Sequence, residues 1–198
     1  MPSHRRHQDH YGRRAKREGK AARSIYKLEE MDGRWRILRP GATVLDLGCS
    51  PGSWSQYAAE KVGPHGHVVG YDLKPVSVSL PSWAEARVGD VFAISLETLP
   101  LAIDVILSDM APSTMGDHAT DAARSARLAE RALAVAERLL VPGGSVVVKV
   151  LEGGELPGLV RGMRAAYTRV EQLRPDATRK RSTEIFLVGL GRKGATTT

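Results

Sequence analysis

Residues 44–54 read VLDLGCSPGSW, an apolar run that stops at an aspartate and passes into small residues. The run from 42 to 48 is short and is bounded by Pro-Gly and by Gly, which is typical of a buried parallel strand. The following stretch, SWSQYAAEKV (53–62), has a helical pattern and stops at Gly63-Pro64. A strand, a loop of small residues and a helix in this order predict a ligand against the loop.

Predicted strands and helices alternate along the rest of the chain. We expect strands over 67–73, 85–91, 102–110, 144–151, 168–174 and 184–191, and helices over 20–31, 120–140 and 156–166. This alternation predicts an α/β fold with a doubly wound sheet and helices on both faces. Ligands of such sheets bind beyond the carboxyl ends of the strands. Aspartates stand at those ends, namely Asp46, Asp72, Asp90 and Asp109, although each one alone is equally explained as a turn residue.

The loop after the first predicted strand excludes two common nucleotide-binding motifs. It contains neither the G-x-G-x-x-G pattern nor the G-K-[ST] of a P-loop. S-adenosylmethionine fits instead, with a carboxylate, a ribose diol and an adenine that each need a partner. We expect Asp72 to accept hydrogen bonds from the ribose and Asp90 from the adenine amino group. Gly52 would let the backbone approach the cofactor, and Trp54 would either contact the cofactor or pack in the core.

The positive charge is concentrated in the first fifth of the chain. The net charge is +7, and residues 1–39 contain 12 Lys and Arg against 5 Asp and Glu, whereas residues 40–198 contain 17 of each. We predict a basic, flexible tail over 1–19 and a single domain over 20–198. The tail either binds a polyanion or only keeps the chain soluble, and charge alone does not separate nucleic acid from an acidic membrane surface. The candidate phosphate-binding residues are Arg13, Arg14, Lys16, Arg17, Lys20 and Arg23, with a second patch at Arg179, Lys180 and Arg181.

Other features bear on the compartment. No apolar run approaches the roughly 20 residues that span a bilayer, and the N-terminus lacks the apolar core of a secretory signal. The single cysteine, Cys49, excludes an internal disulfide and a cysteine-based metal cluster. We therefore expect a cytoplasmic protein without a metal site.

Lys149 interrupts the apolar strand VVVKV (146–150). A buried cation needs a partner, which would make this lysine a functional candidate. The alternative is a lysine at the edge or end of a strand that reaches solvent.

Six motifs together resemble the FtsJ/RrmJ-type RNA ribose 2'-O-methyltransferases. In chain order they are RSIYKLEE (23–30), DLGCSPGSWSQY (46–57), YDLKP (71–75), SDMAPS (108–113), GGSVVVKV (143–150) and RSTEIFLVGLG (181–191). The resemblance runs from about residue 10 to 193. It implies a Rossmann-like class I methyltransferase fold, with a seven-stranded, mostly parallel sheet whose last strand is antiparallel. Bacterial members that methylate a uridine ribose in 23S ribosomal RNA are the most similar in size and layout.

The same resemblance implies the site residues. The implied catalytic tetrad consists of Lys27, Asp109, Lys149 and Glu184, and the implied cofactor contacts are Gly52, Trp54, Asp72, Asp90 and Asp109. We expect Lys149 to accept the proton of the attacking hydroxyl or to steer that hydroxyl, with Asp109 orienting the lysine. Lys27 and Glu184 would position the ribose. The chain departs from the family pattern at Cys49, Ser53 and Ser113, where the family usually carries alanine, glycine and asparagine.

The predicted function is methyl transfer from S-adenosylmethionine to a ribose 2'-hydroxyl of 23S rRNA in the large ribosomal subunit. We expect the protein to act as a monomer. Two alternatives remain: a tRNA 2'-O-methyltransferase, and a non-catalytic RNA-binding factor for ribosome assembly. The intact tetrad argues against the second of them.

Overall fold

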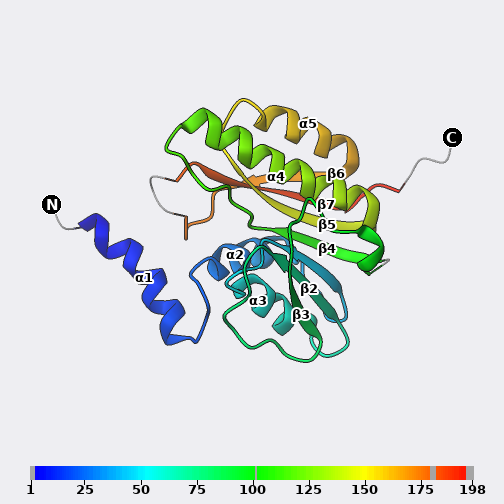
Figure 1. Cartoon of the computed structure of the whole chain (residues 1–198), viewed down its shortest axis with the longest axis horizontal. Coiled ribbons are helices and arrows are strands. Elements are labelled where there is room, and N and C mark those ends of the chain that lie inside the picture. Colours follow the sequence, from blue (N-terminus) through cyan, green and yellow to red (C-terminus); the bar gives the residue numbers. More distant parts are fainter. Residues whose placement is uncertain (1–2, 101, 179–181, 195–198) are drawn as a thin grey trace.

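The described part of the chain forms one seven-stranded sheet in the order β3-β2-β1-β4-β5-β7-β6. The structure, a computed structural model, describes residues 3–100, 102–178 and 182–194. The strands are β1 (Thr43–Leu47), β2 (His67–Asp72), β3 (Ala84–Val88), β4 (Ile103–Ser108), β5 (Leu140–Leu151), β6 (Tyr167–Leu173) and β7 (Glu184–Arg192). The pairs among β1 to β5 are parallel, whereas β7 runs antiparallel to both β5 and β6. The predicted, mostly parallel sheet with an antiparallel last strand is confirmed (Figure 1).

Helices cover both faces of the sheet, as the alternating pattern predicts. They are α1 (Ser3–Arg17), α2 (Ile25–Trp35), α3 (Ser53–Val62), α4 (His118–Leu139) and α5 (Leu156–Ala166), with a short 3-10 turn at Leu96–Thr98. Helices α4 and α5 lie on one side of the sheet, and α2 and α3 lie on the other (Figure 1). On β5, Val146 and Val148 pack into the α4/α5 side and Val147 into the α2/α3 side. Burial on both faces explains the continuous apolar run of this strand.

The helix predicted over 20–31 is displaced toward the C-terminus. Helix α2 begins later than predicted and continues past Gly33. Asp32 explains the extension, because this buried residue accepts hydrogen bonds from the amide of Leu38 (2.8 Å) and the hydroxyl of Tyr57 (3.0 Å). These bonds hold the last turns of α2 against α3, so the helix continues through Gly33 to Trp35.

The segment predicted as a flexible tail, residues 1–19, contains the whole of α1. Ala15 is buried, and Tyr11 packs against the core beneath α2 and α3. The packed core therefore begins before the predicted domain boundary at residue 20, and the flexibility of the segment stays a prediction. The second basic patch, Arg179 to Arg181, lies outside the described residues. No helix of the described ranges is both long and apolar enough to cross a bilayer.

Candidate active site

A pocket of about 550 Å³ lies at the carboxyl ends of β1, β2 and β4, where the sequence predicts the ligand. Its lining includes Gly48, Asp72, Asp90 and Asp109, which follow or end successive strands. Strand β1 lies between β2 and β4, so the strand order reverses direction here. Such a switch point is the usual ligand site of doubly wound sheets.

Two of the predicted aspartates face this pocket with carboxylates that the backbone holds in place. The Oδ2 atom of Asp72 accepts a hydrogen bond from the Ser50 amide (3.0 Å), and its Oδ1 atom accepts one from the Lys74 amide (2.9 Å). The Oδ1 atom of Asp90 accepts one from the Phe92 amide (2.9 Å). A carboxylate oxygen can accept more than one hydrogen bond, so both groups can also bind hydroxyls or amines of a ligand.

Gly48, which the sequence analysis did not assign to the site, brings the loop after β1 close to the loop after β4. Its φ of 82° is left-handed, and a Cβ atom there would lie 2.6 Å from Cγ of Met110. The predicted glycine, Gly52, is also left-handed, with a φ of 111°, and a Cβ there would collide with Val78. Gly52 shapes the turn into α3, and Gly48 is the glycine that lines the pocket.

Trp54 lies in the core beneath the α2/α3 layer. Its indole Nε1 donates a hydrogen bond to the carbonyl of Ser24 (2.9 Å), and its ring centroid lies 5.7 Å from that of Phe186. Neither Gly52 nor Trp54 is among the described residues that line the pocket. The geometry therefore agrees with the core-packing alternative for Trp54.

Apolar side chains that the sequence analysis did not single out form the walls of the pocket. Five of them are Tyr71, Leu73, Val91, Phe92 and Met110, and Leu128 of α4 also lines the pocket. Leu73 is 70% exposed and Phe92 49% exposed, which leaves apolar surface for a flat ring to cover. The first five stand within two positions of Asp72, Asp90 or Asp109, so the sequence could have indicated them as neighbours of the strand-end acids.

Two lysine–carboxylate pairs lie near one another, and Asp109, a member of one pair, lines the pocket. The Nζ atom of Lys149 donates to Oδ1 of Asp109 (2.8 Å) and to its carbonyl oxygen (2.5 Å). The Nζ atom of Lys27 lies 2.5 Å from Oε1 of Glu184. Each lysine is only 7% exposed, so the alternative of a solvated strand-end lysine does not describe Lys149. Four residues that are distant in the sequence are thus joined in two pairs.

The two pairs also influence one another. Burial by itself raises the pKa of Glu184, but the charge of Lys27 and, to a smaller extent, that of Lys149 hold this pKa below its ordinary value. The pairing of β5 with β7 explains why Glu184 lies near Lys149. Lys149 pairs with Phe186, and Leu151, two positions further along β5, pairs with Glu184. Residues two apart on a strand share one face. Glu184 is therefore ionised at neutral pH beside both lysines.

Asp46 lies within β1, fully buried under the loop. Burial raises its pKa to about 7, and the nearby carboxylates of Asp109 and Asp72 add to this, while a hydrogen bond from Ser55 Oγ (2.6 Å) opposes it. Its Oδ1 atom has no hydrogen-bond partner among the described residues. Asp46 is a strand-end acid of the sequence pattern, but it supports the loop and does not line the pocket.

The loop between β4 and α4 is held by Asp121, which the sequence analysis did not identify. This buried carboxylate accepts hydrogen bonds from the amides of Met115 (2.9 Å) and Gly116 (3.3 Å). The loop carries Ser113 to the pocket and leaves Met115 68% exposed. The sequence could have indicated this role, because Asp121 lies in the first turn of α4, just after a loop rich in small residues.

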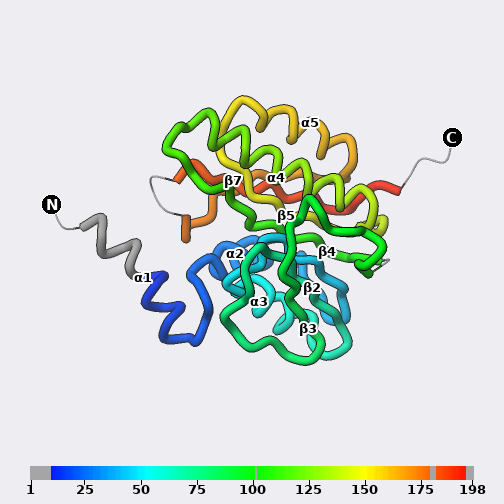
Figure 2. Tube along the Cα trace, in the orientation of Figure 1, coloured from blue at the N-terminus to red at the C-terminus, as the bar shows by residue number. Residues whose placement is uncertain are grey.

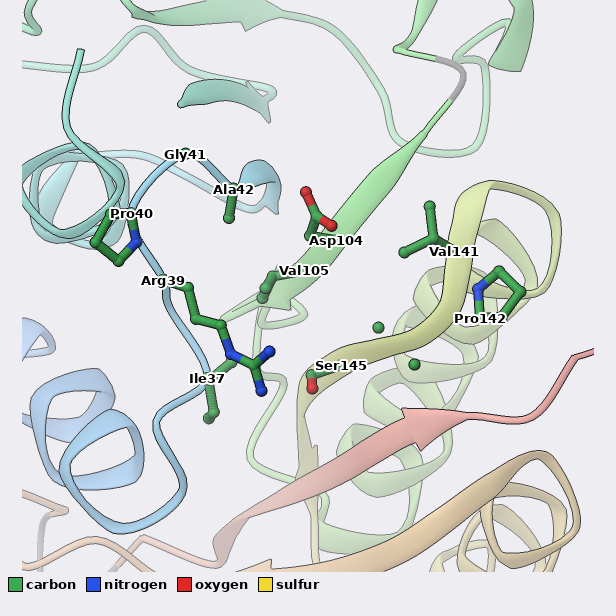
Figure 3. Close-up of a pocket in the computed structure, with 12 residues that line it drawn as sticks. Ile37, Arg39, Pro40, Gly41, Ala42, Asp104, Val105, Val141, Pro142 and Ser145 are labelled. Carbon is green, nitrogen blue, oxygen red and sulfur yellow. The ribbon is translucent and has the colours of Figure 1, made fainter. Parts of the chain in front are cut away.

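A second hollow of about 370 Å³ lies at the opposite end of the sheet (Figure 3). Arg39, Asp104 and Ser145 stand around it, and Asp104 accepts a hydrogen bond from the Thr43 amide (2.8 Å). None of the predicted site residues is in its described lining. The pocket at the carboxyl ends is therefore the candidate active site.

Comparison with known proteins places the chain among methyltransferases. The profile of the FtsJ-like methyltransferase family matches residues 21–192. The protein named "Ribosomal RNA large subunit methyltransferase E" from Desulfatibacillum aliphaticivorans is 46% identical over 189 residues, which cover 94% of this chain and 91% of that protein. The protein of the same name from Bdellovibrio bacteriovorus is 46% identical over 191 residues, which cover 93% of this chain and 97% of that protein.

Solved structures share the fold. A crystal structure of a ribosomal RNA methyltransferase from Plasmodium falciparum has a TM-score of 0.75 at 24% identity, and the match covers 88% of this chain and 99% of that one. An rRNA methylase from Clostridium thermocellum has a TM-score of 0.59 at 16% identity, with 84% and 97% covered. At these identities the likeness shows the fold alone, which is the predicted Rossmann-like methyltransferase fold.

Proposed function

The chain belongs to the FtsJ-like methyltransferase family, and we propose that it transfers a methyl group from S-adenosylmethionine to a ribose 2'-hydroxyl of 23S rRNA in the large ribosomal subunit. The proposal rests on one observation: Lys149 pairs with Asp109, which lines the strand-end pocket, and the nearby Glu184 pairs with Lys27. The names of relatives that are 46% identical over almost the whole chain favour large-subunit ribosomal RNA as the substrate.

The pocket suits the parts of S-adenosylmethionine. Asp72 is available to the ribose diol and Asp90 to the adenine amino group, while Leu73 and Phe92 offer apolar surface to the adenine ring. Gly48 and Ser50, two small residues of the loop after β1, line the pocket and leave room for the methionine end. When bound, this cofactor supplies a sulfonium methyl group that an oxygen nucleophile can attack in line.

Lys149 is assigned to the proton of the attacking hydroxyl. The amine form that this role requires would direct both Nζ hydrogens to Asp109, one to the carbonyl and one to the carboxylate. The lone pair then occupies the remaining tetrahedral position. A ribose 2'-hydroxyl at that position would give its proton to Nζ as its oxygen attacks the methyl group that S-adenosylmethionine would supply, with the thioether as the leaving group.

Lys27 and Glu184 are assigned to the ribose. Glu184 is ionised and accepts hydrogen bonds, and Lys27 donates them. Lys27 is further fixed by the ring of Phe186, whose centroid lies 5.4 Å from its Nζ atom. A charged pair with one partner on α2 and the other on β7 holds a hydroxyl-bearing ring in one orientation.

Labelled S-adenosylmethionine tests the proposal. The protein is incubated separately with large ribosomal subunits, free 23S rRNA and tRNA, and the modified ribose is mapped. We expect a single 2'-O-methylated uridine in 23S rRNA. Label in tRNA alone would favour the tRNA alternative, and cofactor binding without transfer to any RNA would favour the non-catalytic factor. Sedimentation of the active protein checks the further expectation that it acts as a monomer, and localisation in cells checks the cytoplasm.

A further inference from the structure

The visible part of α1 has two different faces. Tyr11, Arg14, Ala15 and Glu18 follow the i, i+3, i+4, i+7 spacing that places residues on one side of a helix. Glu18 is the first residue after α1. Ala15 is buried and Tyr11 packs against the core, so this side faces the body of the protein. Arg13, Lys16 and Arg17 follow the i, i+3, i+4 spacing of the opposite side of the helix, and all three are exposed.

On α2, the inner side of α1 contacts Tyr26, and Nη2 of Arg14 also lies 4.0 Å from Oε2 of Glu29. The Tyr26 hydroxyl donates a hydrogen bond to Oε2 of Glu18 (2.9 Å), and Oε1 of Glu18 accepts one from Nε of Arg14 (2.9 Å). The guanidinium carbon of Arg14 lies 4.3 Å from the centroid of the Tyr26 ring. The same ring also packs against the ring of Tyr11, with the centroids 5.5 Å apart. Arg14, Glu18 and Tyr26 thus form a closed network, here named the Tyr26 latch.

The Tyr26 latch is adjacent to the candidate active site. Tyr26 and Lys27 are consecutive residues in the first turn of α2, and both are buried. Lys27 is bonded to Glu184. Just before them, the Ser24 hydroxyl lies 2.8 Å from that of Ser53, at the start of α3. Helix α1 is therefore fixed against the element that carries one lysine of the tetrad, as the neighbouring positions of α1 and α2 in Figure 2 show.

We propose that the Tyr26 latch holds α1 in a fixed position beside Lys27, so that the exposed cations Lys16 and Arg17 bind the phosphate backbone of the RNA substrate while its ribose enters the tetrad. Arg14, Glu18 and Tyr26 are then positioning residues, and Arg14 is not a phosphate ligand as its charge alone suggests. The RNA partner rests on the proposed function. An acidic membrane surface fits less well, because helices that lie on membranes expose large apolar residues opposite their cations, and the inner side of α1 is already packed.

The sign of one charge change tests the latch. Glu18→Ala removes a negative charge next to the basic face, so electrostatics alone predicts tighter RNA binding. The latch predicts the opposite, a KM for RNA about threefold higher or more, because a smaller fraction of molecules has α1 in place. Glu97→Ala is the matched control, since it makes the same charge change in the distant turn Leu96–Thr98. Tyr26→Phe, which changes no charge, is expected to raise the KM as well.

Two readouts separate the latch from a general structural defect. In Glu18→Ala and Tyr26→Phe, kcat and the Kd for S-adenosylmethionine should stay within about twofold of the wild type, while the amides of residues 11–17 exchange with deuterium faster. The proposal is overturned if Glu18→Ala binds RNA as tightly as the wild type or more tightly, or if exchange in α1 is unchanged. A wild-type protein that binds RNA but methylates none would refute the proposed function, and RNA affinity and exchange would still decide on the latch.

Discussion

The stability of an Asp46→Asn variant relative to the wild type should increase as the pH rises from 5 to 8. Burial raises the pKa of Asp46 to about 7, from an ordinary value of 3.8. A carboxyl with a raised pKa binds its proton more tightly in the folded state. Its ionisation therefore begins to destabilise the fold above pH 3.8, and this effect is complete only above pH 7. Asparagine keeps the shape and can still accept the hydrogen bond from Ser55.

The size of the effect follows from the shift in pKa. One pKa unit corresponds to about 1.4 kcal/mol, so the full shift of Asp46 destabilises the folded state by about 4 kcal/mol. About 1.5 kcal/mol of this is already present at pH 5, and about 2.5 kcal/mol is added between pH 5 and pH 8. The stability difference between Asp46→Asn and the wild type should grow by that second amount, whatever the substitution costs at a fixed pH.

Urea unfolding of the cofactor-free proteins at pH 5 and pH 8 measures this difference. Ser55→Ala is a useful companion, because the Ser55 hydroxyl favours the carboxylate form of Asp46. Without that hydroxyl the pKa rises further, and the loss of stability toward pH 8 should be larger than in the wild type. A difference between Asp46→Asn and the wild type that is the same at both pH values would refute the reasoning, since it would mean that Asp46 ionises without a burial penalty.

Three further substitutions test the candidate site. Lys149→Ala should lower kcat/KM for RNA by about a thousandfold or more, with the Kd for S-adenosylmethionine within about twofold in a direct binding assay; near-normal turnover would remove Lys149 from the mechanism. Asp72→Ala should raise the Kd for the cofactor about tenfold or more, because hydrogen bonds to the ribose are lost, and calorimetry that finds no change would contradict the assigned ribose contact. Gly48→Ala should cost about 1–3 kcal/mol in urea unfolding, because a left-handed residue gains a Cβ against Met110, whereas the matched change Gly33→Ala, in a helix with open space around it, should gain about 0.5–1 kcal/mol.

The sequence predicts the sheet and the pocket well because both depend on short-range patterns. Apolar runs mark most of the parallel strands, and β1 to β4 each end at or close to an aspartate, so the pocket lies where Asp72, Asp90 and Asp109 predict it. Short-range patterns do not show which of the two glycines, Gly48 or Gly52, lines the pocket. It depends on how closely the loop after β4 approaches, which is a contact between Gly48 and Met110 from distant parts of the chain.

Helix α1 shows why other features were missed. Its inner side lacks the apolar period that marks an amphipathic helix, because Arg14 and Glu18 make the contacts there. Hydrophobic periodicity treats Arg14 and Glu18 as polar residues, so it does not reveal that they pack against another helix. Tyr11 and Arg14 of α1 contact the ring of Tyr26, which lies on α2. This contact forms only when the two helices pack together, so the sequence of α1 alone does not predict it.

The antiparallel direction of β7 is what completes the candidate site. Because β7 runs against β5, its first residue, Glu184, pairs with Leu151 at the carboxyl end of the sheet, next to Lys149. A parallel strand in the same place would put Glu184 at the amino end, about 25 Å away, near the hollow of Figure 3. Stability gives little reason for the two pairs, since the cost of burying two charges largely offsets their attraction, and valine would complete the apolar run around Lys149. The orientation of β7 and the retention of buried lysines both make sense if the carboxyl end of the sheet must hold ammonium and carboxylate groups beside one pocket.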